Sequence, residues 1–261
     1  MNLEEMKRKL AQVKSGNKAN PHLFKPEEGA QLIRIVPLQS NRENPFIELY
    51  FHYDFDGKTI LSPLSYGERD PIAEFSDSLI DDGGGKMSKD EYKLAKKFYP
   101  TLRTFVPVVV RGKESEGVKF WSFGKTIFEK LLQIIDDEDY GDITDIEHGF
   151  DLTLTFIPKE KSSTKRFPDV DITPRRKESV LTTDEKLLDI LLNHQPDIFK
   201  DVFNQRFTYE ELAKKLSEFS ATQQTEAPQS SATSTVVPEE APEERSLPAD
   251  VDAEFSKLYE S

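Results

Sequence analysis

Residues 117–130 read GVKFWSFGKTIFEK and join a strand pattern directly to a helix pattern. Gly124 ends the strand pattern, and the apolar spacing of residues 125–135 predicts an amphipathic helix. Residues 105–111 (FVPVVVR) precede this stretch across a glycine-containing loop, so we predict a β-hairpin followed by a helix. The alternation of residues 118–123 gives the second strand two faces: Lys119, Trp121 and Phe123 on one, and Val118, Phe120 and Ser122 on the other.

Further strand and helix patterns lie on both sides of this stretch. Apolar runs bounded by turn residues predict strands at residues 31–36, 46–53, 58–61 and 150–158. Apolar spacing, and capping boxes that begin at Ser88, Thr182 and Thr208, predict helices at residues 71–79, 88–98, 183–193 and 209–219. The expected fold class is mainly β with appended helices, with an OB-type Greek-key barrel core, although periodicity alone also allows a sandwich.

The composition of the 261-residue chain excludes several classes of protein. The chain has no cysteine, which excludes a disulfide framework, thiol catalysis and cysteine-ligated zinc. It has no apolar signal core at its start and no run of roughly 18 apolar residues, so we expect a soluble, non-secreted protein. A net charge of −13, if evenly spread, would argue against nucleic acid as a partner.

The charge is not evenly spread, because the last part of the chain is strongly acidic. Residues 222–261 hold nine acids and two bases, and residues 221–246 have the composition of a disordered linker. Residues 250–259 then carry one apolar stripe on an acidic peptide, which indicates folding into a groove of a partner. The predicted partner-binding residues are Asp250, Val251, Asp252, Glu254, Phe255, Leu258 and Tyr259.

A basic and aromatic segment lies in the middle of the chain. Residues 86–130 have eleven bases, five acids and eight aromatic residues, and residues 158–177 add seven bases against three acids. Single-stranded nucleic acid is bound by cations that follow its phosphates and by rings that stack on its bases. Alternatively, the rings form the core and the lysines a solvated face. The predicted DNA-binding residues are Lys96, Lys97, Tyr99, Arg103, Phe105, Arg111, Lys119, Trp121, Phe123, Lys125, Lys165, Arg166, Arg175 and Arg176.

Residues 117–130 resemble the strand–Phe-Gly-Lys–helix segment of the T4-type bacteriophage single-stranded DNA-binding proteins. Residues 32–37 and 44–46 resemble the first barrel strands of that family, and the pair Lys96 and Lys97 resembles its basic patch. The resemblance implies a protein that coats single-stranded DNA with tolerance of base sequence during phage replication, recombination and repair, in the cytoplasm of the infected host. It also implies cooperative self-association through Lys7, Arg8 and Lys9.

The resemblance divides the chain into three parts and raises the question of zinc. It implies a basic arm at residues 1–20, an OB-type core at 21–220, and a disordered acidic tail at 221–261 that recruits replication proteins such as a polymerase or helicase loader. Family members carry a structural zinc held by Cys and His. The matching residues 62–72 contain neither, so we expect no zinc and no other cofactor.

Two other functions compete with DNA binding. Asp136, Asp137, Glu138, Asp139 and Asp142 could hold Mg²⁺ in a nuclease, but consecutive acids after an apolar helix are more typical of a solvated loop. An acidic scaffold protein of replication is the other alternative. We expect a protein that binds DNA and is not an enzyme.

Overall fold

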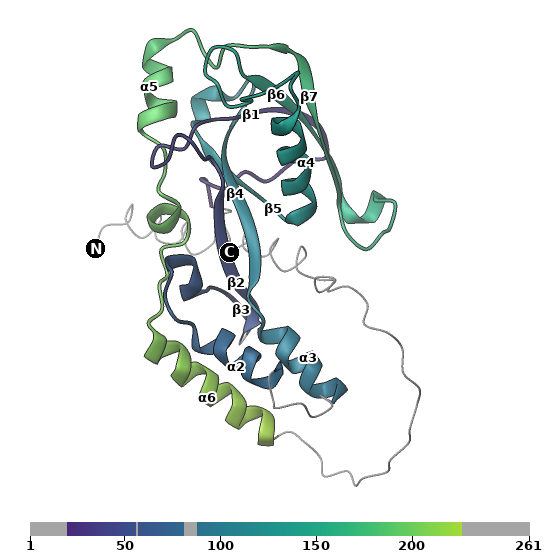
Figure 1. The fold of residues 1–261 in the computed structure, drawn as a ribbon, viewed down its shortest axis with the longest axis vertical. Coiled ribbons are helices and arrows are strands. Elements are labelled where there is room, and N and C mark those ends of the chain that lie inside the picture. Colours follow the sequence, from purple (N-terminus) through teal and green to yellow (C-terminus); the bar gives the residue numbers. More distant parts are fainter. Residues whose placement is uncertain (1–19, 56, 81–87, 226–261) are drawn as a thin grey trace, which may run out of the picture.

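The computed structural model describes residues 20–55, 57–80 and 88–225. The predicted arm with Lys7, Arg8 and Lys9 and the predicted partner-binding residues 250–259 lie outside the described residues. The described chain forms a seven-stranded antiparallel sheet with helices packed at both of its ends (Figure 1). The predicted fold class, mainly β with appended helices, is confirmed.

The sheet is built from strands that are far apart in the sequence. Its order is β3-β2-β4-β1-β6-β7, and β5 pairs with β4 off this path. β1 therefore lies between two strands that follow it by more than 60 residues. The strands are β1 (Gly29–Ile35), β2 (Ile47–Phe55), β3 (Lys58–Leu61), β4 (Thr101–Val110), β5 (Lys119–Phe123), β6 (Phe150–Ile157) and β7 (Asp169–Glu178).

β4 is the central strand and has three partners. Along one edge it pairs with β2 up to Phe105 and with β1 from Val108 onward, while β5 pairs along its other edge. Pro107 has no N–H to donate, and it lies between the last β2 pair and the first β1 pair. Pro107 is also the register partner of Phe120 of β5, but its carbonyl accepts from the Val36 N–H on the opposite edge, so the missing N–H faces away from β5.

Helix α4 (Lys125–Asp136) turns back after Gly124 and covers the face of β5 that carries Trp121. Ile127 and Leu131 from α4 join Trp121 and Phe123 in the main hydrophobic core. Phe120, on the other face, joins a second core with Phe105 and Phe51. Both faces of β5 are therefore buried.

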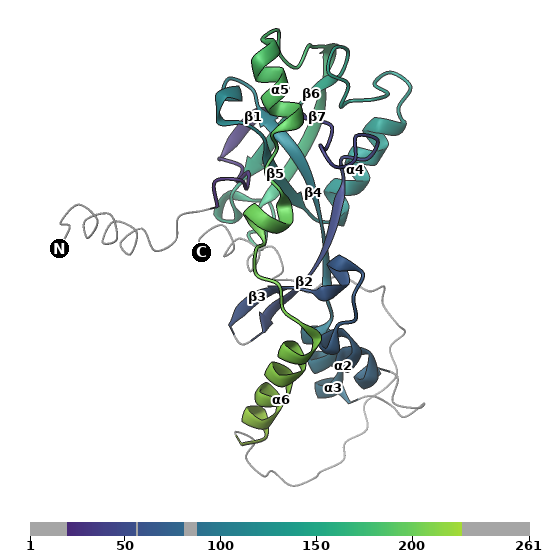
Figure 2. The ribbon, with the colours of Figure 1, turned by 90° about the vertical axis from the view of Figure 1, so that its left-hand side faces the viewer.

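Three helices pack at the lower end of the sheet, below β2 and β3 (Figures 1 and 2). They are α2 (Pro71–Ile80), α3 (Lys89–Phe98) and α6 (Tyr209–Thr225). Phe98 and Leu212 from these helices share a core with Phe55 and Ile60 of the hairpin. This core fixes the end of α3 close to the start of β4.

The rest of the described chain connects the upper and lower ends. Helix α5 (Glu185–Asn193) packs at the upper end, and the segment that follows it runs down past the sheet to α6 (Figure 2). Short helical turns complete the fold: η1 (Pro63–Tyr66), η2 (Glu114–Glu116), η3 (Lys159–Lys161) and the π-helix η4 (Ile198–Val202).

Most predicted elements are confirmed, with three differences. β7 was not predicted, because its charged, proline-containing sequence lacks an apolar alternation. The side chain that caps α5 is Asp184, and not Thr182. Helix α6 continues to Thr225, so residues 221–225 are not part of a disordered tail; alanine and glutamine in this stretch favour continued helix.

Candidate nucleic-acid interface

The end of α3 places two lysines and a tyrosine beside the start of β4. Tyr99 follows the helix and is 51% exposed. Lys97 lies 3.6 Å from Asp54 Oδ2, and its ammonium group lies 5.4 Å from the ring centroid of Phe219. Lys96 is half-buried one residue earlier. The predicted pair of lysines and Tyr99 are thus brought together at one site.

The adjoining face of the sheet is partly open. Tyr50 of β2 and Leu102 of β4 are register partners, and antiparallel partners point to the same side of a sheet. Leu102 is 38% exposed and Tyr50 is half-buried. Neither was predicted as a site residue. Tyr50 lies beside Leu102 because β2 pairs with β4, and the sequence patterns did not predict that pairing.

Lys125 lies on the other side of this open face, at the start of α4. Phe123 of β5 pairs with Thr104 of β4, which brings the beginning of α4 next to Leu102. The Lys125 side chain is highly exposed and lies 3.6 Å from Glu129. The N-cap residue of α4 is Gly124, which contributes no side-chain cap. We call Lys96, Lys97, Tyr99, Tyr50, Leu102 and Lys125 the candidate interface.

Three of the predicted stacking residues belong to the core instead. Phe105, Trp121 and Phe123 are 0%, 2% and 4% exposed, so none of these rings presents a face to a ligand. The prediction that they stack on bases is wrong, and the alternative that they are core residues holds. Lys119 suggested an open face for Trp121, but α4 covers that face.

Arg103 is also buried, on the side of β4 opposite Leu102. A Cβ placed on Gly124 would come within 3.3 Å of the Arg103 Nη1 atom, so the guanidinium lies against the turn between β5 and α4. Arg103 therefore supports the turn that begins α4, and it does not offer its charge at the surface.

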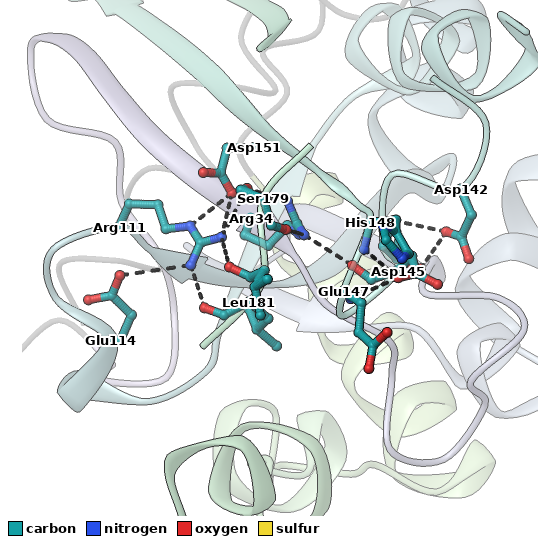
Figure 3. Close-up of polar contacts among 12 residues, drawn as sticks. Arg34, Arg111, Glu114, Asp142, Asp145, Glu147, His148, Asp151, Ser179 and Leu181 are labelled. Atoms are coloured by element: carbon teal, nitrogen blue, oxygen red, sulfur yellow. Dashed lines mark hydrogen bonds and ion pairs between the residues drawn. The ribbon is translucent and has the colours of Figure 1, made fainter. Parts of the chain in front are cut away.

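Arg111 is part of a largely buried network of hydrogen bonds and ion pairs (Figure 3). Its Nε atom donates to Asp151 over 2.8 Å, and its Nη atoms donate to the carbonyl oxygens of Leu181 and Val180. Arg34 donates to the same carboxylate over 3.1 Å. Burial lowers the pKa of Arg34, and the neighbouring Asp151 charge opposes this shift. The Arg111 donors already have partners within the chain, so the structure does not favour the prediction that Arg111 binds DNA.

The remaining predicted cations lie elsewhere on the fold. Lys119 forms an ion pair with Glu116. Lys165 and Arg166 are exposed between β6 and β7, and the Arg166 guanidinium lies 5.7 Å from the ring of Phe167. Arg175 and Arg176 are exposed on β7, at the opposite edge of the sheet from the β2–β3 hairpin. The structure does not bring these residues to the candidate interface.

The acidic segment after α4 is a loop in which carboxylates accept hydrogen bonds from nearby backbone N–H groups. Asp137 accepts from the Asp139 N–H over 3.0 Å, and Asp142 accepts from the Thr144 N–H over 2.9 Å. Within residues 20–55, 57–80 and 88–225, no group of three or more His, Cys, Asp or Glu residues is placed to hold a metal ion. The described residues therefore offer no support for the nuclease alternative.

The described chain thus combines an antiparallel sheet with cations and an exposed tyrosine beside a partly open strand face, which are features suited to binding single-stranded nucleic acid. The sequence model of the family described as "gp32 DNA binding protein like" matches residues 27–220. The chain therefore belongs to this family of DNA-binding proteins, which confirms the resemblance noted in its sequence. No curated protein matches the chain. Among the described helices, none is long and apolar enough to cross a membrane.

Proposed function

We propose that this protein binds single-stranded DNA with little dependence on base sequence and without catalysis. The observation that supports this most directly is the arrangement of the candidate interface. Lys96 and Lys97 at the end of α3 lie with Tyr99 at one end of the open strip formed by Tyr50 and Leu102, and the exposed Lys125 at the start of α4 lies beside Leu102. Single-stranded DNA matches such a surface, because its phosphates can contact the cations and its bases can stack on the tyrosine ring.

Each part of the candidate interface has a physical role in this proposal. Lys96, Lys97 and Lys125 attract phosphates, and the first N–H groups of α4 add hydrogen-bond donors because Gly124 leaves them without a side-chain cap. Tyr99 offers a ring on which one base can stack. A stacked ring of this kind contributes about 1–3 kcal/mol for any base. Single strands are favoured over duplex because only their bases are free to stack.

The wider role extends this proposal to the parts outside the described residues. Lys7, Arg8 and Lys9 of the basic arm make binding cooperative by contacting the next protein on the strand. The acidic residues after 225 recruit replication proteins and compete with DNA for the lysines. The protein would then act in phage DNA replication, recombination and repair, in the cytoplasm of the infected host. It would do so without a metal or other cofactor.

The proposal is tested by titrating the full chain with fluorescent oligo-dT, oligo-dA and a duplex of equal length at two salt concentrations. We expect tight and similar binding to both single strands, weak binding to the duplex, and a strong loss of affinity at the higher salt. Equal affinity for all three, or no binding, would contradict the proposal. A nuclease is revealed in the same samples by shortening of the oligonucleotides when Mg²⁺ is added.

A further inference from the structure

Three buried polar side chains meet between the sheet and helices α2 and α3. His52 lies on β2, Ser62 follows β3, and Asp70 precedes α2; none of them is more than 1% exposed. The family resemblance implies zinc in the segment that begins at Ser62. The side chains that meet here do not fit zinc, because they offer one imidazole, one carboxylate and one hydroxyl, and the chain has no cysteine to supply the thiolate ligands of a Cys/His site.

Hydrogen bonds join these three side chains and connect both helices to β2. His52 Nε2 lies 2.8 Å from Asp70 Oδ2, and His52 Nδ1 lies 2.9 Å from the carbonyl oxygen of Phe98. The Ser62 hydroxyl donates to the same Asp70 oxygen. The other oxygen of Asp70 accepts from the N–H groups of Ile72 and Ala73, over 2.8 and 3.2 Å, and so caps α2.

The partners of Asp70 and His52 determine where the protons lie. Burial works to raise the pKa of Asp70, but hydrogen bonds from His52 and Ser62, together with the charge of His52, hold it below its ordinary value. Asp70 is therefore an acceptor. The carbonyl oxygen of Phe98 can only accept, so the Nδ1 atom of His52 donates to it. Among the described residues, Asp70 is the charged side chain in contact with His52.

The contact with Phe98 places this network directly beneath the candidate interface. Phe98 is the last residue of α3, Lys96 and Lys97 precede it, and Tyr99 follows it. Loss of the His52 contact would leave the Phe98 carbonyl buried without this donor, and it would release the end of α3.

We propose that His52, Ser62 and Asp70 form a metal-free clamp that fixes the end of α3 to the sheet. This clamp positions Lys96, Lys97 and Tyr99 for DNA binding, a role that rests on the function proposed above. The three side chains are positioning residues, because they are buried and do not touch DNA themselves.

The experiment compares the full chain with two variants and a matched control. His52→Gln carries both of its N–H donors on one nitrogen and so does not reproduce the two separate contacts of the ring, whereas His194→Gln changes an exposed histidine of the upper end. We expect hydrogen exchange at the end of α3 to become about tenfold faster in His52→Gln, with weaker oligo-dT binding, because a buried hydrogen bond is lost. His194→Gln should match the unmodified chain. Unchanged exchange at α3 in His52→Gln would overturn the clamp.

Asp70→Asn is a second variant, which keeps the shape of the side chain and replaces one acceptor oxygen with an NH₂ donor group. Its amide can donate to the Nε2 atom of a neutral His52, and its oxygen can still cap α2. Ring ¹⁵N chemical shifts should therefore report a protonated Nδ1 atom in both proteins, because the Phe98 carbonyl oxygen can only accept. Exchange at α3 should stay close to that of the unmodified chain. An unprotonated Nδ1 atom in the unmodified chain would overturn the contact between His52 and Phe98.

Metal content and DNA binding are measured on the same samples. We expect elemental analysis to find no stoichiometric zinc, and EDTA to change neither the melting temperature nor α3 exchange. One zinc per chain, removable with loss of stability, would overturn the metal-free clamp. If the unmodified chain does not bind oligo-dT, the proposed function fails, whereas exchange and ring shifts still decide whether the clamp exists.

Discussion

The Nε atom of Arg111 donates to the Oδ1 atom of Asp151 over 2.8 Å, and this contact gives a residue from the basic segment a structural role. Asp151 also accepts from Arg34, so one carboxylate serves two buried or nearly buried guanidinium groups. Gly149 completes the packing, because a Cβ there would come within 2.9 Å of the Arg34 guanidinium. The network joins β1, β4 and β6 to the chain that leaves β7.

We expect Asp151→Ala to lower the free energy of unfolding by about 3–5 kcal/mol, because it leaves the buried Arg34 charge without its carboxylate. Urea denaturation measures this loss. Glu114→Ala is the matched control, since its contact with Arg111 is longer, at 4.0 Å, and it should have a small effect. A similar small effect of Asp151→Ala would show that the network contributes little to stability.

Charge reversal of Lys96 and Lys97 should weaken oligo-dT binding and reduce the slope of log K against log salt concentration. Two lost phosphate contacts correspond to a change of about 1.4 in that slope for single strands. The double variant Lys113→Glu with Lys186→Glu makes the same change in net charge on exposed residues of the upper end. Equal salt slopes in the two double variants would show that Lys96 and Lys97 of α3 do not contact DNA phosphates.

Tyr99 and Trp121 should respond in opposite ways to truncation. Tyr99→Ala should weaken oligo-dT binding by about 1–3 kcal/mol with little change in melting temperature, because the ring is exposed. Trp121→Ala should instead lower the free energy of unfolding by about 3–5 kcal/mol, because it leaves a core cavity. Anisotropy titration and urea denaturation of both variants check this. Loss of oligo-dT affinity in a stably folded Trp121→Ala variant would indicate that the Trp121 ring contacts DNA.

Asp70 should make the protein sensitive to acid. Its pKa is below the ordinary value in the folded chain, so the carboxylate contributes stability above the unfolded pKa, about 3.9, and loses it as the pH falls through the folded value. The urea midpoint of the unmodified chain should therefore fall more between neutral pH and pH 3 than that of Asp70→Asn. Parallel acid losses in both proteins would contradict this assignment.

Removal of residues 226–261 should tighten oligo-dT binding, because nine acids and two bases no longer compete for the lysines. The truncation after Thr225 keeps the whole of α6. A full-length chain with the tail acids changed to amides is the control for length, and it should bind as tightly as the truncated one. Unchanged or weaker binding in both would mean that the tail is not an inhibitor.

Local patterns predicted much of the secondary structure because their causes lie within a few residues. The capping box at Thr208 forms in both directions: Thr208 Oγ1 accepts from the Glu211 N–H, and Glu211 accepts from the Thr208 N–H. The change from strand to helix at Gly124 is confirmed as well. β7 could not be found in this way, because its pairing with β6 is long-range and its outward residues are charged.

The candidate site was predicted less completely because charge and aromatic content do not reveal what covers a residue. The pair Lys96 and Lys97, Tyr99 and Lys125 all lie in the candidate interface. Arg111 and Trp121 come from the same basic segment, yet they are drawn into buried contacts with Asp151 and with α4. Tyr50 gave no signal of its own, since its place beside Leu102 depends on a strand pairing across 52 residues.

The sequence by itself determined the fold class, the family, the strand–helix junction at Gly124 and the uneven distribution of charge, because periodicity, capping and composition are local properties. Only the tertiary structure decided which faces are covered. Strand alternation predicts that Trp121 and Phe123 share one side of the strand, but it does not predict that α4 folds over that side. Likewise, His52, Ser62, Asp70 and Phe98 meet because packing brings separate segments together, and burial then requires each polar atom to find a partner.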